Sequence, residues 1–125
     1  MMYFFIAIIW GHFIGDFILQ SDKMALNKSK SNFYLFYHVT VYMMPFMICS
    51  AWIDTRVLIP WLVSNFILHF ITDYISSRTA SYYWNNNKRH QFFVTIGFDQ
   101  AVHITCLVVT YVVFINDKIQ ISCLT

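Results

Sequence analysis

Four histidines and three aspartates lie within otherwise apolar stretches of the sequence. They are His12, Asp16, His38, His69, Asp73, Asp99 and His103. Imidazole nitrogens and carboxylate oxygens are the ligands of Zn, Mn and Fe sites, and a carboxylate beside such a metal can act as a general base for water. The set is therefore a candidate metal centre, with Asp16, Asp73 and Asp99 as candidate catalytic groups.

Six of the seven residues form pairs spaced four apart. The pairs are His12/Asp16, His69/Asp73 and Asp99/His103. In an α-helix, residues i and i+4 lie on one face, so each pair would point in one direction. One such pair usually satisfies only itself, whereas three pairs and a fourth histidine at one depth favour a functional centre. A metal-free proton relay and a purely structural network are the alternatives.

Four apolar stretches carry these residues, over about 2–19, 33–53, 57–75 and 92–115. Each is close to the ~20 residues that a helix needs to cross the hydrocarbon core of a bilayer. Charged residues make up 11% of the chain, against roughly 25% in soluble domains. The sequence therefore predicts one all-α domain over residues 1–125, an integral membrane four-helix bundle. Pro45 predicts a kink in the second stretch.

The basic residues predict how this bundle is oriented. Six of the eight lie in the connections at 20–32 and 76–91. The positive-inside rule puts these connections in the cytoplasm and both termini outside. The net charge of +2 is too small for a nucleic-acid partner. The lipid bilayer is the expected partner, with a homo-oligomer as a further option.

Residues 12–18 and 69–75 are similar, with five of seven positions identical. This repeat predicts two tandem helical hairpins. The fourth stretch runs in the opposite direction and has its Asp before its His. The reversal would place Asp16, Asp73 and Asp99 in one layer near the cytoplasm. A deeper layer would hold His12, His69 and His103, with His38 between or beside the two.

The whole pattern resembles a known family. It consists of His12-x3-Asp16-Phe17-x2-Gln20, Lys28, His38, His69-x3-Asp73-Tyr74 and Asp99-Gln100-x2-His103. The sequence is similar over about residues 3–115 to small bacterial and bacteriophage membrane proteins of unknown function. That resemblance implies four helices and a prokaryotic or phage setting, and with it a bacterial inner membrane as the location of a multi-pass protein. More loosely, the His-x3-Asp motif resembles inner-membrane metal-dependent hydrolases.

Three functions are compatible with these observations. The first is a metal-dependent hydrolase that acts on a membrane lipid or phosphoester, with one aspartate as general base and a Zn, Mn or Fe ion. The second is a proton or metal transporter or conduit. The third is a non-catalytic phage membrane protein that acts on a host partner, in which the His/Asp centre only holds the helices together.

Overall fold

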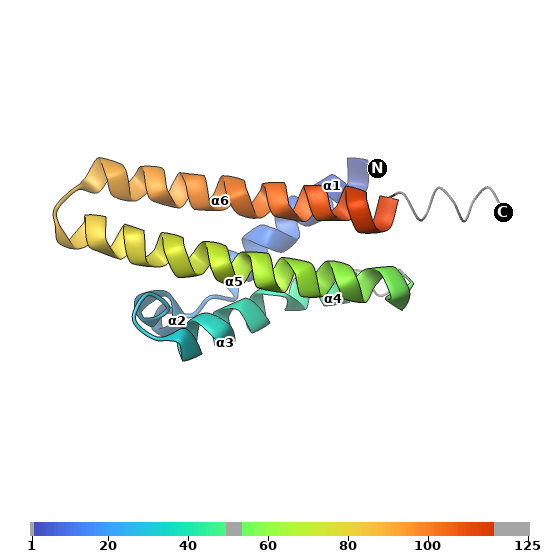
Figure 1. The fold of residues 1–125 in the computed structure, drawn as a ribbon, viewed down its shortest axis with the longest axis horizontal. Coiled ribbons are helices and arrows are strands. Elements are labelled where there is room, and N and C mark those ends of the chain that lie inside the picture. The colour runs from blue at the N-terminus through green and yellow to red at the C-terminus, as the bar shows by residue number, and fades with distance from the viewer. Residues whose placement is uncertain (1, 50–53, 117–125) are drawn as a thin grey trace.

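The computed structural model describes residues 2–49 and 54–116. Within these ranges the chain forms helices and turns and no strand (Figure 1). The longer helices are α1 (Met2–Phe13), α3 (Asn32–Tyr42), α5 (Thr55–Asn85) and α6 (Arg89–Tyr111). The shorter elements are α2 (Asp22–Asn27), α4 (Met44–Cys49) and the π-helical turns η1 (Ile14–Ile18) and η2 (Val112–Asn116). The predicted all-α fold is confirmed.

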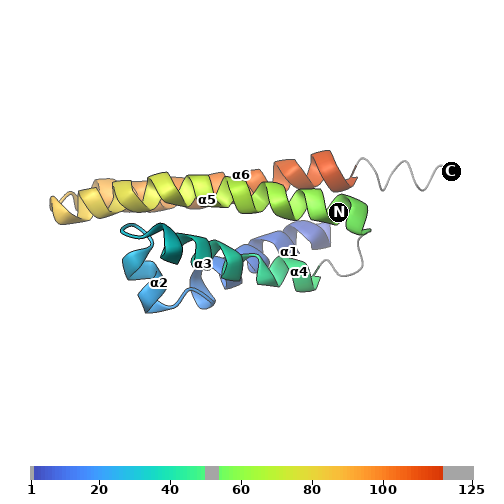
Figure 2. The same cartoon turned by 60° about the horizontal axis from the view of Figure 1, so that its bottom comes forward.

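The long helices alternate in direction along the chain. Figures 1 and 2 show α1 and α5 running one way, and α3 with α4 and α6 running the other way. The hairpin of α5 and α6 extends well beyond α2 and α3 at one end. This is the arrangement expected of two tandem helical hairpins, and it brings the two His-x3-Asp motifs onto parallel segments.

The segment 76–91 is mostly helical, where the sequence analysis expected a connection. Helix α5 continues to Asn85 and α6 begins at Arg89. Polar residues do not by themselves end a helix: Thr79 and Arg78 donate hydrogen bonds to carbonyls four residues earlier, at Ile75 and Tyr74. The chain turns only at Asn87, whose φ of 58° is a left-handed conformation that asparagine tolerates.

The second apolar stretch is divided, as the proline predicted. Helix α3 ends at Tyr42, and α4 starts at Met44 with Pro45 in its first turn. Proline has no N–H to donate to the preceding turn, and its ring clashes with the carbonyl four residues earlier. The predicted end of this stretch, at residues 50–53, lies outside the described residues.

Two helices in the described ranges are long and apolar enough to cross a membrane, namely Thr55–Asn85 and Arg89–Phe114. The segment Tyr3–Ile18 is also apolar but is shorter. Large apolar side chains cover much of the outside: Ile48 is 74% exposed, Phe98 69% and Trp10 60%. The surface is therefore suited to an apolar environment.

One end of the bundle has an apolar core. The residues of this apolar core are Ile8, Tyr42, Met43, Phe46, Leu58, Trp61, Leu107 and Tyr111. Phe46 packs edge-on against Trp61, with 5.8 Å between ring centroids. Asn65 borders this core and donates hydrogen bonds of 2.8 Å to the Trp61 carbonyl and to Thr110 Oγ1. These contacts join α5 to α6 and fix α4 against α5.

Candidate metal centre

The structure brings all seven predicted residues together and buries them. We call this set the polar cluster: His12, Asp16, His38, His69, Asp73, Asp99 and His103. Each of these residues is at most 5% exposed. They come from α1, η1, α3, α5 and α6, so every long helix contributes to the cluster. Within it, three overlapping groups of His and Asp atoms are close enough to share a metal ion.

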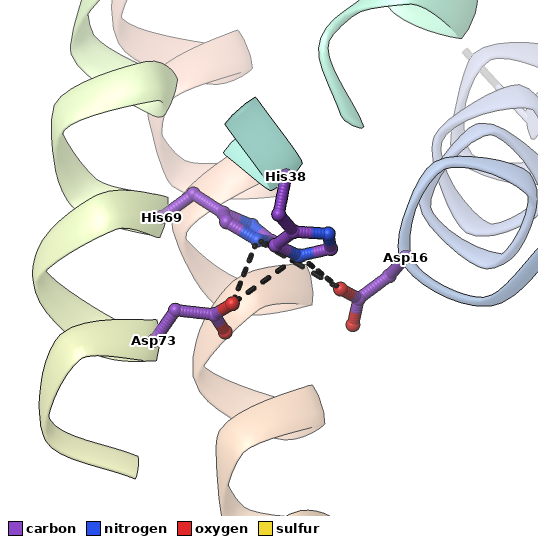
Figure 3. Close-up of side chains that lie close together, drawn as sticks. All are labelled: Asp16, His38, His69 and Asp73. Carbon is purple, nitrogen blue, oxygen red and sulfur yellow. Dashed lines mark hydrogen bonds and ion pairs between the residues drawn. The ribbon is translucent and has the colours of Figure 1, made fainter. Parts of the chain in front are cut away.

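Four atoms of the cluster converge on one point: His38 Nε2, His69 Nε2, Asp16 Oδ1 and Asp73 Oδ2 (Figure 3). His38 Nε2 lies 3.1 Å from Asp16 Oδ1 and 3.2 Å from Asp73 Oδ2. The two Nε2 atoms are 3.3 Å apart. His69 Nε2 lies 3.7 Å from Asp73 Oδ2 and 3.8 Å from Asp16 Oδ1.

These separations, 3.1–3.8 Å, scatter by about 0.2 Å around the spacing of ligands that share one metal ion. Two ligands of a tetrahedral ion with bonds of about 2.0–2.2 Å lie roughly 3.3–3.6 Å apart. Hydrogen bonding alone accounts for the arrangement less well, because a single N–H that is shared among several acceptors bonds each of them weakly. Here His38 Nε2 faces two carboxylates and a second imidazole nitrogen at once.

The backbone around Asp16 is specialised for close packing. Asp16 lies in the π-helical turn η1, which directly follows α1. A Cβ on the neighbouring Gly15 would lie 2.7 Å from the Tyr42 carbonyl oxygen. Only glycine lets the chain come this close to α3, and π-helical turns are frequent at functional sites. The turn and the glycine together place the Asp16 carboxylate beside His38.

Aromatic stacking fixes the orientation of two imidazoles. The His69 ring lies between Tyr42, at a centroid distance of 3.8 Å, and His103, at 3.9 Å. The His69 and His103 rings are nearly parallel, at 13°. A ring held on both faces keeps its nitrogens aimed in a fixed direction, as a preformed ligand site needs.

His12 already has partners for both ring nitrogens. Its Nδ1 lies 3.1 Å from the Tyr42 hydroxyl and its Nε2 lies 2.8 Å from Gln100 Oε1. Gln100 also donates to Asp16 Oδ2 at 2.8 Å and to Asp99 Oδ2 at 3.0 Å. In this arrangement His12 orients Tyr42 and Gln100, and through Gln100 it acts on two of the carboxylates.

His103 and Asp73 leave buried atoms without a hydrogen-bond partner. These atoms include Asp73 Oδ1 and both ring nitrogens of His103, and His103 Nε2 lies 3.7 Å from Asp73 Oδ1. On the other side of the ring, His103 Nδ1 lies 3.5 Å from Asp99 Oδ2, and Asp99 Oδ1 accepts a short hydrogen bond from Ser76. A carboxylate beside one imidazole nitrogen orients the other toward a metal. Asp99 therefore lies behind His103, one step from the four converging atoms.

Lys28 supplies a positive charge to the cluster. Lys28 directly follows α2, and its Nζ lies 2.8 Å from Asp73 Oδ2. Burial lowers the pKa of this ammonium, but the Asp73 and Asp16 carboxylates raise it by more, so the net shift is upward. With neutral histidines, three carboxylates and one ammonium leave two negative charges. A divalent cation would balance this buried charge, which is costly on its own.

Comparison with known proteins gives one match. Residues 4–125 match the family described as "Protein of unknown function (DUF3307)". The chain belongs to the DUF3307 family. No curated protein and no solved structure matches it. Membership in DUF3307 therefore supports the predicted family of unknown function and assigns no activity to the cluster.

Sequence reasoning missed two members of the centre of this DUF3307 chain. Lys28 is one of the basic residues from which the sequence predicts the orientation, yet it pairs with Asp73. Gln100 entered only as part of the resemblance, yet it bridges His12, Asp16 and Asp99. Its position directly after Asp99 was the available signal. Lys28 offered a weaker one, as a lysine in the family pattern.

Proposed function

We propose that the protein is an integral membrane protein whose helices hold one divalent metal ion, Zn, Mn or Fe, between His38, His69, Asp16 and Asp73. We further propose that this centre is a metal-dependent hydrolase. The observation that carries the proposal is the convergence of two imidazole nitrogens and two carboxylate oxygens with separations of 3.1–3.8 Å. Four protein ligands of this type are within the known range for Zn, Mn and Fe.

The remaining residues of the cluster are suited to hydrolysis. A divalent ion at this point would need a fifth position beside the four protein ligands, where it would polarise an ester oxygen or make a bound water more acidic. We call His38 Nε2, His69 Nε2, Asp16 Oδ1 and Asp73 Oδ2 the four-atom set. Asp99 is outside this set and can take a proton from the attacking water, as a general base. Gln100 and Ser76 donate hydrogen bonds to its two oxygens and so hold it in place. Asp16 and Asp73, the other catalytic candidates, would then serve as ligands.

A conduit has less support than an enclosed site. Transport through the bundle requires polar groups along its whole length. Beyond the polar cluster, the described interior is the apolar core, with Trp61 and Leu107 each 1% exposed. Asn65 and Thr110 lie at the border of this core and are hydrogen-bonded to each other. An enclosed site reached from one end fits this distribution better than a path through the membrane.

The proposed orientation follows from charge. The end of the bundle next to the cluster carries Lys23, Lys28 and Lys30 near α2, and Arg78, Lys88 and Arg89 near the α5–α6 turn. We place this end at the cytoplasmic face of a bacterial inner membrane, with both termini outside. Alkaline phosphatase fused after residue 125 would be active only if the C-terminus is outside.

Metal content tests the proposal. The Zn, Mn and Fe contents of detergent-purified protein are measured by elemental mass spectrometry. The wild type is compared with the variants His69→Ala and His90→Ala. His90 is an exposed histidine outside the cluster, so it controls for the loss of an imidazole as such. We expect about one ion per chain in the wild type and in His90→Ala, and at least a tenfold lower content in His69→Ala.

Helical content by circular dichroism shows whether each variant is folded. Wild-type protein that is folded, and that takes up no stoichiometric metal even after incubation with Zn, Mn or Fe, would contradict the proposal. Equal metal content in all three proteins would contradict the assigned ligands.

A further inference from the structure

A cavity of about 500 Å³ lies beside the polar cluster, where η1, α2, α5 and α6 meet. Asp16 and Asp99 form part of its lining. Lys30 and Trp84, which are exposed, line it as well, so the cavity reaches the surface of the bundle. It therefore leads from the end that carries the basic residues to Asp16, one of the four proposed metal ligands, and to Asp99.

The polar part of the lining is suited to an anion. Lys28 and Lys30 bring two positive charges to the cavity. Gln20 and Ser77 also line it, and each has a buried side-chain oxygen, Oε1 and Oγ, without a hydrogen-bond partner among the described residues. Buried polar atoms are almost always paired in native proteins, so these two indicate a missing ligand or ordered water. The Ser77 hydroxyl can donate to an anionic oxygen, whereas Gln20 can do so only through its Nε2 group, because Oε1 accepts hydrogen bonds.

The remaining lining is apolar. Phe17, Leu26, Phe92 and Ile96 form this part of the wall, beside the Trp84 ring. Trp84 and Phe92 are in contact, with ring centroids 4.9 Å apart. A free inorganic anion would gain nothing from such a wall, whereas a hydrocarbon chain would. The cavity thus combines an anion site with an apolar surface.

We infer that this cavity binds an amphiphilic phosphate monoester, with the phosphate at Lys28, Lys30, Gln20 and Ser77 and the alkyl chain along the apolar wall. This ester would be the substrate of the proposed metal centre, an assignment that rests on the proposed function. It would react with water. The water oxygen bonds to phosphorus and the phosphorus–oxygen bond to the alkyl group breaks. One water proton passes through Asp99 to the leaving oxygen, so the products are an alcohol and inorganic phosphate.

Charge makes binding dependent on the metal. Asp16 and Asp99 would repel the phosphate, since both carboxylates line the same cavity. A divalent ion at the four-atom set would cancel this repulsion. The amphiphile should therefore bind the metal-loaded protein much more tightly than the metal-free protein.

The test uses the full chain in a maltoside detergent, loaded with Zn, and follows Trp84 fluorescence. The probes are dodecyl phosphate, dodecyltrimethylammonium with the same chain and opposite charge, and inorganic phosphate. We expect saturable binding of dodecyl phosphate, at least ~100-fold tighter than inorganic phosphate because of the buried chain. The cationic amphiphile should not compete. The signal should vanish in Trp84→Phe.

A matched pair of lysine variants locates the phosphate. Lys30 lines the cavity, whereas Lys23 is an exposed lysine of the neighbouring α2 that does not. Lys30→Gln should weaken dodecyl phosphate binding about fivefold, the effect of ~1 kcal/mol from one lysine near an anion. Lys23→Gln should leave it unchanged, and both variants should keep their metal.

Failure of this inference is distinguishable from failure of the proposed function. Zn-loaded protein that binds none of the probes, or binds inorganic phosphate as tightly as dodecyl phosphate, overturns the amphiphile site and leaves the metal centre standing. Equal effects of Lys30→Gln and Lys23→Gln also overturn it. Saturable binding without release of inorganic phosphate supports the site and contradicts hydrolysis of this ester. Protein that takes up none of Zn, Mn and Fe contradicts the metal centre itself.

Discussion

The apolar core and the polar cluster are neighbours in one small bundle, but they are held together by different forces. In the apolar core, Trp61 and Phe46 pack by shape, and few directional contacts set their positions. In the polar cluster, ion pairs, hydrogen bonds and stacked rings set the position of each side chain. Tyr42 belongs to both regions, since it packs in the core, stacks on His69 and bonds to His12.

The difference indicates what each region is for. Packing tolerates substitution by apolar groups of similar volume. A buried set of carboxylates and imidazoles is costly, and an apolar replacement would serve stability as well or better. The polar cluster is therefore best explained by a task other than stability, and the core by stability. Variants that separate stability from metal binding test this contrast.

The largest effect is expected from Asp73→Asn. Asp73 provides one of the four converging atoms, and the residue is 0% exposed. An amide oxygen is a weaker ligand and carries no charge, so metal affinity should fall at least ~100-fold, since losing even an outer partner costs 10–100-fold. Competition with a chelator measures the affinity. Asp22→Asn, at an exposed aspartate of α2, should change nothing; similar losses in both would break the contrast.

A large effect on stability alone is expected from Trp61→Ala. Trp61 is 1% exposed and lies in the apolar core, away from the four-atom set. Removing a buried ring leaves a cavity, and the free energy of unfolding should fall by about 3–5 kcal/mol. Denaturant titration of the protein in mixed micelles measures it. Folded Trp61→Ala should still bind one metal ion, and loss of metal from folded protein would contradict the separation of the two regions.

Gly15→Ala should affect both regions, because Gly15 lies where α1 and η1 approach α3. The added Cβ would lie 2.7 Å from the Tyr42 carbonyl oxygen and 2.9 Å from its ring. Moving the backbone apart should cost about 1–3 kcal/mol of stability and weaken metal binding by displacing Asp16. Gly97→Ala is the matched control, since its Cβ would meet nothing within 4 Å. That variant should stabilise α6 by about 0.5–1 kcal/mol.

The smallest effect is expected from Arg56→Ala. Its guanidinium pairs with Asp54 at 3.0 Å, but its side chain is 89% exposed. Exposed ion pairs of this kind contribute little to stability, because water and salt screen the two charges. The variant should keep its metal, and thermal unfolding should be nearly unchanged. A loss of stability comparable to that of Trp61→Ala would show that charge pairs hold the apolar end as well.

The positions of the seven cluster residues were predictable because helical periodicity is simple. Spacings of four placed each pair on one face, and the Asp-before-His order in α6 matched the antiparallel direction seen in Figures 1 and 2. The extension of α5 to Asn85 was not predictable from hydropathy, since polar helices continue without an apolar signal. Its end depends on the left-handed Asn87.

Other features depend on contacts that sequence spacing does not contain. The π-helical turn at Asp16 follows from the approach of Gly15 to Tyr42. The pairing of Lys28 with Asp73 joins residues 45 positions apart through the loop after α2. Gln100 connects three cluster residues because it lies on α6 where that helix faces α1 and η1. Each of these is a tertiary contact between segments that the sequence shows only separately.

X-ray absorption spectroscopy at the metal edge tests the central claim most directly. For the Zn-loaded protein we predict a first shell of nitrogen and oxygen at about 2.0–2.1 Å, with outer-shell scattering from two imidazoles and no sulfur. The His90→Ala variant should give the same spectrum, and His38→Ala should lose one imidazole. A first shell of water oxygens without imidazole scattering, or one containing sulfur, would contradict the account.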